Sequence, residues 1–198
     1  MESFGGLAAT SEVDVDLITD AYRISGVVQT RFARVTDIVN QLLGGHLAVE
    51  RATINEHAYP AATLSAPSAM VDVGSILLLA APGLTGAASS EMRIPKRAVK
   101  ALLALPPIRV TGTIHVPMGS RPLDGLLNVT DRFLAMTDVT IASGRYPELA
   151  VTVEVAAICR ARAQVLLVAD DERPDELLAD VLDERTAEAW LRSDNDSR

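Results

Sequence analysis

Hydrophobic and polar residues alternate in several short stretches of the chain, which is the pattern of a strand with one buried face. In residues 108–116 almost every second side chain is apolar, and the positions between them are mostly polar. Gly112 falls on the apolar face, where a missing side chain permits a β-bulge or a close approach of neighbouring backbone. A second alternating stretch covers residues 149–155. The sequence therefore predicts a strand at both places.

Two other runs, residues 76–79 and 165–168, lack this alternation and are apolar at every position. A strand that is apolar on both faces is typical of the centre of a sheet or of a small closed barrel. We therefore expect both runs to form buried strands.

Similar segments recur in the same order in the two halves of the chain, which predicts an internal duplication. Tyr22–Gly26 and Ile108–Gly112 both read apolar, Arg, β-branched, hydroxyl, Gly. The further matches are 36–43 with 123–130, 47–48 with 134–135, 53–54 with 140–141, 59–60 with 146–147 and, after a shift, 75–80 with 164–169. Each unit then reads as strand, loop, short helix, strand, strand and final strand.

The expected fold class is α+β and mainly β, with two tandem pseudo-equivalent small β units that are sheet-like or barrel-like. Each unit would carry one short helix, capped by Thr36 or Asp37 in the first copy and by Ser120 or Asp124 in the second. The expected divisions are a first unit at 1–82, a linker and lead-in strand at 83–106, a second unit at 107–171 and an acidic helix with a frayed tail at 172–198. The pattern leaves open whether the units pack face to face or form one composite barrel.

The expected C-terminal helix begins at Pro174, a favoured first helical position. Its apolar stripe includes Leu178, Val181, Leu182 and Trp190, with acidic residues between them. We expect these four side chains to bind a protein partner or a second copy of the chain.

Composition favours a packed, acidic protein of 198 residues, 48% hydrophobic and 22% charged, with a net charge of −8. The net charge is −5 over residues 1–82, +2 over residues 83–171 and −5 over residues 172–198, which disfavours nucleic-acid binding. No apolar run approaches the length that spans a bilayer, and the lone Cys159 makes no internal disulfide. We expect a cytoplasmic protein that does not bind membranes.

The second copy resembles an uncharacterised small bacterial β domain of unknown function. The resemblance lies in I-R-V-T-G-T-I-H-V-P-M-G-S-R-P-L-D-G-L-L-N and R-F-L-A-M-T-D-V-T-I, and extends over roughly residues 108–170. The first copy keeps only the frame, since it lacks the Pro-x-Gly turn and has His46 in place of Phe133. The resemblance implies a small β unit and no activity.

Arg121, Asp124 and Asn128 form the candidate ligand site next to the turn at 117–120. They could bind a small anion or a nucleotide, with Arg121 as a forked donor. The alternative is structural, with Asp124 capping a helix and Arg121 holding the loop. The three histidines lack metal-ligand spacing, so we expect no metal and no cofactor.

The residue patterns of nucleophilic, phosphate-binding and paired-carboxylate enzymes do not occur in the chain. The leading hypothesis is therefore a non-enzymatic interaction or scaffold protein that forms homo-oligomers, because small β units have edge strands that need cover. The alternative is a small-ligand or nucleotide sensor that binds between the two repeats.

Overall fold

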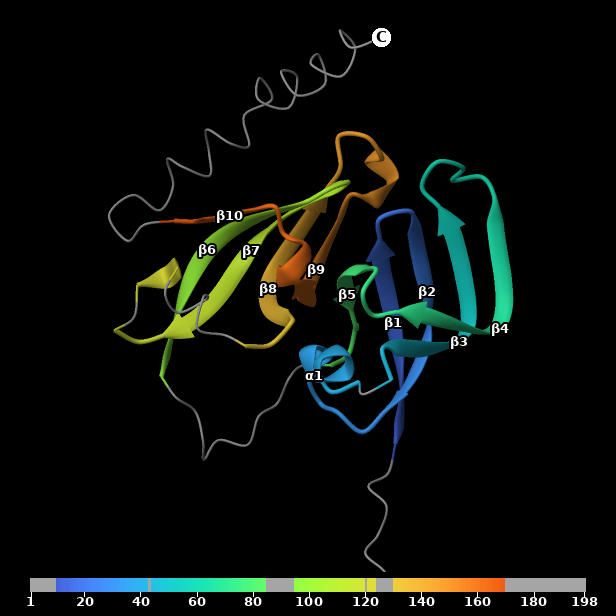
Figure 1. Ribbon diagram of the computed structural model, residues 1–198, viewed down its shortest axis with the longest axis horizontal. Helices are drawn as coiled ribbons and strands as arrows, with labels where there is room; N and C mark the ends of the chain where they lie inside the picture. The colour runs from blue at the N-terminus through green and yellow to red at the C-terminus, as the bar shows by residue number, and fades with distance from the viewer. Residues whose placement is uncertain (1–9, 43, 85–94, 120, 124–129, 170–198) are drawn as a thin grey trace, which may run out of the picture.

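The computed structural model describes residues 10–42, 44–84, 95–119, 121–123 and 130–169, and these form one antiparallel sheet of ten strands (Figure 1). The strands of the N-terminal half are β1 (Ser11–Thr19), β2 (Tyr22–Thr30), β3 (His46–Glu56), β4 (Thr63–Asp72) and β5 (Ile76–Ala80). Those of the C-terminal half are β6 (Lys96–Leu105), β7 (Ile108–Pro117), β8 (Phe133–Ala142), β9 (Val151–Cys159) and β10 (Val165–Val168). Their order across the sheet is β10-β6-β7-β8-β9-β5-β1-β2-β3-β4.

Helix is scarce in the described part of the chain. It consists of the six-residue α1 (Val35–Asn40), the two helical residues Pro122 and Leu123, and two short 3-10 helices, η2 (Pro147–Leu149) and η3 (Arg160–Arg162). The expected α+β class is therefore wrong, because the described residues form an almost wholly β structure, although the short helix expected in the first unit is present as α1. The expected C-terminal amphipathic helix at 172–198 lies outside the described residues, as does most of the expected second helix, at 124–129.

The two expected units are joined into one sheet, because β5 pairs with β9. The paired residues are Leu78 with Ile158, Leu79 with Ala157 and Ala80 with Ala156. We call this pairing the junction. The expectation of two units packed face to face is therefore wrong, and so is that of one composite barrel. The halves share backbone hydrogen bonds across a continuous sheet with two ends.

Two apolar cores lie on opposite faces of the junction strands. Along β5, Leu78 belongs to the core of the C-terminal half, and the next residue, Leu79, belongs to the core of the N-terminal half. Ile158 and Ala157 divide in the same way along β9. Because successive side chains of a strand point to opposite faces, the middle of the sheet is buried on both sides. This explains why residues 76–80 have no polar face.

The predicted alternation is present in β7 and β9. In β7 the apolar positions are buried and most of the positions between them are more exposed, and in β9 Thr152 and Glu154 are exposed. The prediction of a close backbone approach at Gly112 is confirmed, since an added Cβ would lie 2.9 Å from the Thr137 carbonyl oxygen. The pairing of β7 with β8 shifts register beside this glycine, as at a β-bulge.

The N-terminal half contains the same bulge. The pairing of β2 with β3 shifts register beside Gly26, and the nearby Arg51 has a φ of 49°. The equivalent residue of β8, Asp138, has a φ of 52°. Positive φ is uncommon for residues other than glycine, so its recurrence at matching positions is a specific similarity between the halves.

The expected caps of the first helix are absent. Arg34 is the N-cap residue of α1 and makes no side-chain capping hydrogen bond. Thr36 and Asp37 lie two and three residues beyond the N-cap and are inside the helix, where Asp37 places an acidic group in the first turn. Burial of Val35, Ile38 and Val39 in the N-terminal core fixes where the helix lies.

Candidate functional site

The free edges of β4 and β10 are the most distinctive surface of the described structure. These strands end the sheet, and Figure 1 shows them on opposite sides of the molecule. Within the described residues each pairs on one side only, β4 with β3 and β10 with β6. An unpaired strand edge presents backbone donors and acceptors that can pair with another strand.

Both edge strands also expose large apolar side chains. On β4, Leu64 is 66% exposed and Met70 is 69% exposed. On β10, Val165 is 48% exposed and Leu167 is 41% exposed. Apolar side chains that gather on a free strand edge favour pairing with another chain.

The expectation that residues 165–168 form a buried strand is therefore wrong. Leu166 and Val168 pack against the C-terminal core, but Val165 and Leu167 point away from it. The run 76–79 is equally apolar at every position, yet it is fully buried as part of β5. The difference arises because β9 lies beside β5, whereas β10 ends the sheet.

Strand pairing shows which residues of β5 and β10 occupy the same place. Leu17 of β1 and Leu103 of β6 are equivalent. Each lies one residue before the residue that pairs with the matching arginine of the next strand, which is Arg23 in β2 and Arg109 in β7. Leu17 pairs with Leu79, and Leu103 pairs with Leu166. Leu79 is thus equivalent to Leu166. In the sequence alignment of 75–80 with 164–169, Leu79 falls on Val168 instead, two residues away.

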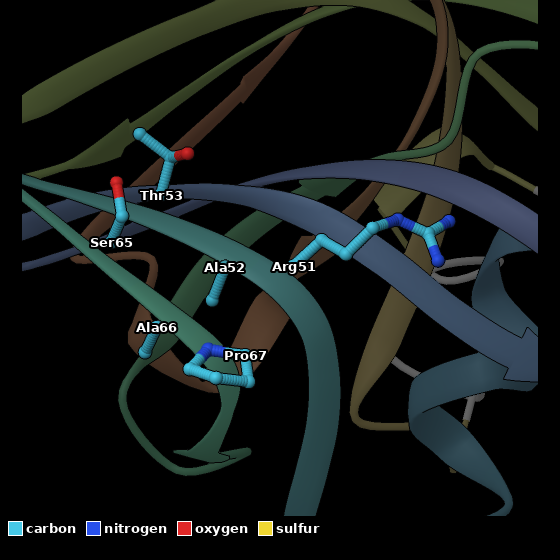
Figure 2. A pocket seen from close by; sticks show the side chains of 6 residues that line it. All are labelled: Arg51, Ala52, Thr53, Ser65, Ala66 and Pro67. Atoms are coloured by element: carbon cyan, nitrogen blue, oxygen red, sulfur yellow. The ribbon is translucent and has the colours of Figure 1, made fainter.

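A hollow of about 350 Å³ lies on β3 and β4 (Figure 2). Its lining residues are Arg51, Ala52, Thr53, Ser65, Ala66 and Pro67. Figure 2 shows the Arg51 side chain running away from Thr53 and Ser65, so small side chains line most of the hollow. It lies where the ladder is interrupted between the pairs Glu50–Ser68 and Ala52–Ala66. The bulge at Arg51 and the missing N–H of Pro67 account for this interruption.

A second hollow, of about 230 Å³, lies between the two halves beside α1. Its described lining residues are Val39, Asn40, Leu42, Gly45, Val73, Thr130, Asp131 and Arg132. The Asn40 amide nitrogen donates to the Phe133 carbonyl, and the Phe133 N–H donates to Asn40 Oδ1, both at 2.9 Å. The role of Asn40 that the structure shows is thus to tie α1 to β8.

Two further sets of contacts also tie the halves together. Arg162 donates to Asp20 at 2.5 Å and to the Gly74 carbonyl at 3.4 Å. The ring of the buried His57 lies 5.3 Å from that of Tyr146, and His57 Nε2 lies 3.1 Å from the Thr19 carbonyl. These contacts give His57 a structural role.

The charged groups with perturbed pKa values lie in ion pairs between strands. The Arg51 guanidinium lies 2.9 Å from Glu12, and this hydrogen bond and charge lower the pKa of the Glu12 carboxyl. The hydrogen bond from Arg23 to Asp16 raises the pKa of Arg23. The depressed pKa of Glu12 favours the folded state above the carboxyl's unfolded pKa, and this contribution is lost as pH falls through the folded value. Because Glu12 and Arg51 are exposed, the contribution is small.

Most of the predicted site residues lie outside the described part of the chain, so these sites stay predictions. Arg121 is exposed, and it is not among the described residues that line either hollow. Asp124 and Asn128 lie outside the described residues, as do the predicted partner-binding residues Leu178, Val181, Leu182 and Trp190. Sequence reasoning missed the exposed apolar residues of β4 and β10.

The remaining candidates for chemistry have ordinary surroundings. Cys159 is buried in the N-terminal core, and His115 lies 3.1 Å from Thr137 Oγ1 on an exposed part of the sheet. Among the described residues no cluster of His, Cys, Asp and Glu is arranged to hold a metal ion. In the same part of the chain no helix has the length and hydrophobicity to cross a membrane.

Comparisons with models of known protein families, with curated proteins and with solved structures found no match.

Proposed function

We propose that this protein is a non-enzymatic scaffold that associates with other copies of itself through the free edges of its sheet. The observation that carries the proposal is the pair of free edge strands, β4 and β10, each with two large exposed apolar side chains. Proteins that remain monomeric blunt such edges with charge, bulges or covering segments. Pairing with a second chain would both satisfy the backbone groups and bury the apolar side chains.

Charge supports a partner contact at these two strands. The described residues of β10 carry no charged side chain, and β4 carries one, Asp72, at its end. The chain as a whole has a net charge of −8, which keeps copies apart elsewhere on the surface. Association would therefore be directed to the edges.

We also propose that the two halves arose by duplication of one unit. Support comes from the equal strand order of the halves and from the matching bulges at Gly26 and Gly112. A chain built in this way repeats its own pairing surface, which favours assembly from copies of itself.

Sedimentation velocity on the full chain over a wide concentration range tests the proposed function. We expect the weight-average sedimentation coefficient to rise with concentration, because edge pairing is a bimolecular step. A rise that is kept at high salt would fit apolar and backbone contacts rather than ion pairs. A single monomeric species at every concentration would contradict the proposal.

A further inference from the structure

We propose that β10 of one copy pairs antiparallel with β4 of the next copy, and that the junction between β5 and β9 sets the register. The pairs would be Val165 with Val71, Leu166 with Met70, and Leu167 with Ala69 of the next copy. This inference rests on the proposed function and specifies its surface. The occupant of each edge is a second copy of this chain.

The first step of the argument is the equivalence of β4 and β9. In the hairpin of β3 and β4, Leu47 pairs with Val71. In the hairpin of β8 and β9, the matching Leu134 pairs with Ile158. Both ladders are interrupted at the same place, at the residue with positive φ. Val71 therefore occupies the place of Ile158, and Met70 occupies the place of Ala157.

The second step is the equivalence of β5 and β10. Since Leu79 is equivalent to Leu166, the neighbours Leu78 and Val165 also occupy matching places. At the junction Leu78 pairs with Ile158. Substituting the equivalent residues gives Val165 opposite Val71, and the other two pairs follow.

The third step concerns the faces of the strands. Leu78 and Ala80 point away from the core of their own half and are buried by the other half. The equivalent residues Val165 and Leu167 also point away from their own core, and they are 48% and 41% exposed. In the proposed register they would lie beside Val71 of the next copy, which faces that copy's N-terminal core.

Met70 completes the match from the other strand. It is 69% exposed, whereas the equivalent Ala157 is fully buried at the junction, where it pairs with Leu79. In the proposed register Met70 would lie over Leu166, next to the C-terminal core of the neighbouring copy. The exposed apolar residues of the paired segments are thus those whose equivalents the junction buries.

The extent of the pairing also fits. β10 has four residues, and the junction contains three residue pairs. On β4, Pro67 lacks an N–H and separates the segment 69–71 from the rest of the strand. Leu64 lies beyond Pro67 and outside the proposed contact. It therefore provides a control position on the same strand.

The assembly would be head to tail. Each copy carries one β10 edge and one β4 edge on opposite sides of the molecule, as Figure 1 shows, so the two surfaces of a contact differ. Such a heterologous contact forms a ring if the rotation between copies closes, and an open chain if it does not.

Cysteine cross-linking tests the register. Leu167→Cys and Ala69→Cys would be made in separate copies of the full chain, mixed and oxidised gently. Directly opposed residues of an antiparallel pair have Cα atoms roughly 4.5–5.5 Å apart, within disulfide range. We expect the mixture to form a cross-linked dimer several-fold faster than either variant alone. Ser65→Cys, on the same face about 13 Å away along β4, is the matched control and should give background linking with Leu167→Cys.

Lysine substitutions provide a second test that does not depend on oxidation. Leu167→Lys would place a charge against the apolar face of the next copy, so its sedimentation coefficient should stay near the monomer value. Leu64→Lys adds the same charge to an exposed position outside the contact and should associate as the unmodified chain does. Far-UV circular dichroism of each variant shows that the fold is kept.

The outcomes separate this inference from the proposed function. If the unmodified chain associates but the Ser65→Cys control links as fast as Ala69→Cys, the register is wrong and the scaffold proposal stands. If Leu167→Lys associates normally, the contact lies elsewhere, such as in residues 172–198. If the unmodified chain is monomeric throughout, both proposals fail.

Discussion

Replacing Gly26 by alanine is expected to destabilise the protein by about 3 kcal/mol, near the upper end of the usual cost of an added group in a packed site. The new Cβ would lie 2.5 Å from Val49 Cγ1 and 2.6 Å from the Glu50 carbonyl oxygen. A backbone oxygen inside a paired strand cannot move aside as the end of a flexible side chain can. The bulge in β3 would have to open to admit one methyl group.

Chemical denaturation of three alanine variants measures this effect against its controls. Gly112→Ala should cost less, about 1–2 kcal/mol, because its nearest contact is a backbone oxygen at 2.9 Å. Gly44→Ala meets no atom within 4 Å and should change stability by less than about 0.5 kcal/mol. Equal effects at all three positions would contradict the close approach of strands at Gly26.

Leu78→Ala is expected to destabilise the chain by about 2–5 kcal/mol, the range for emptying a buried leucine site. Leu78 lies on β5 and is almost fully buried by the C-terminal core. Val165→Ala changes the equivalent residue of β10, which is 48% exposed. It should cost less than about 0.5 kcal/mol in a dilute sample, where chains are not associated.

The comparison of these two variants tests whether the halves share one sheet. Denaturation curves followed by far-UV circular dichroism, which reports on backbone structure, would monitor the whole sheet. If the halves were separate units, Leu78 would be exposed like Val165, and the two substitutions would have similar small effects. A large loss with Leu78→Ala alone supports the junction.

Local structure could be predicted from the sequence where the pattern itself decides it. Alternation identified β7 and β9, and Gly112 marked a place where backbones approach, because only glycine leaves that space. Positive φ at Arg51 had no signal, since arginine shows no preference for that conformation.

The union of the halves could not be predicted, because it depends on which strand lies beside which. Residues 76–79 and 165–168 have the same apolar character, yet β9 covers one and the other ends the sheet. No polar residue marks the register within either run, so the alignment by similarity placed Leu79 on Val168. Pairing with β1 and β6 corrects this by two residues.

The candidate site was missed for the same reason. An exposed Met70 or Leu167 looks like a core residue in the sequence, and exposure becomes visible only when the neighbours are known. The predicted cluster at Arg121 rested on polar residues that are close in sequence. Pro122 and Leu123 are helical, but Asp124 and Asn128 lie outside the described residues, so this cluster stays a prediction.

The central claim is that copies of this chain associate through the free edges of β4 and β10. Hydrogen–deuterium exchange on the full chain at low and high protein concentration tests it most directly. We predict that amides in 165–168 and 69–71 exchange more slowly at high concentration, while those of β2, which is paired on both sides, do not change. Exchange at both edges that is independent of concentration would contradict the claim.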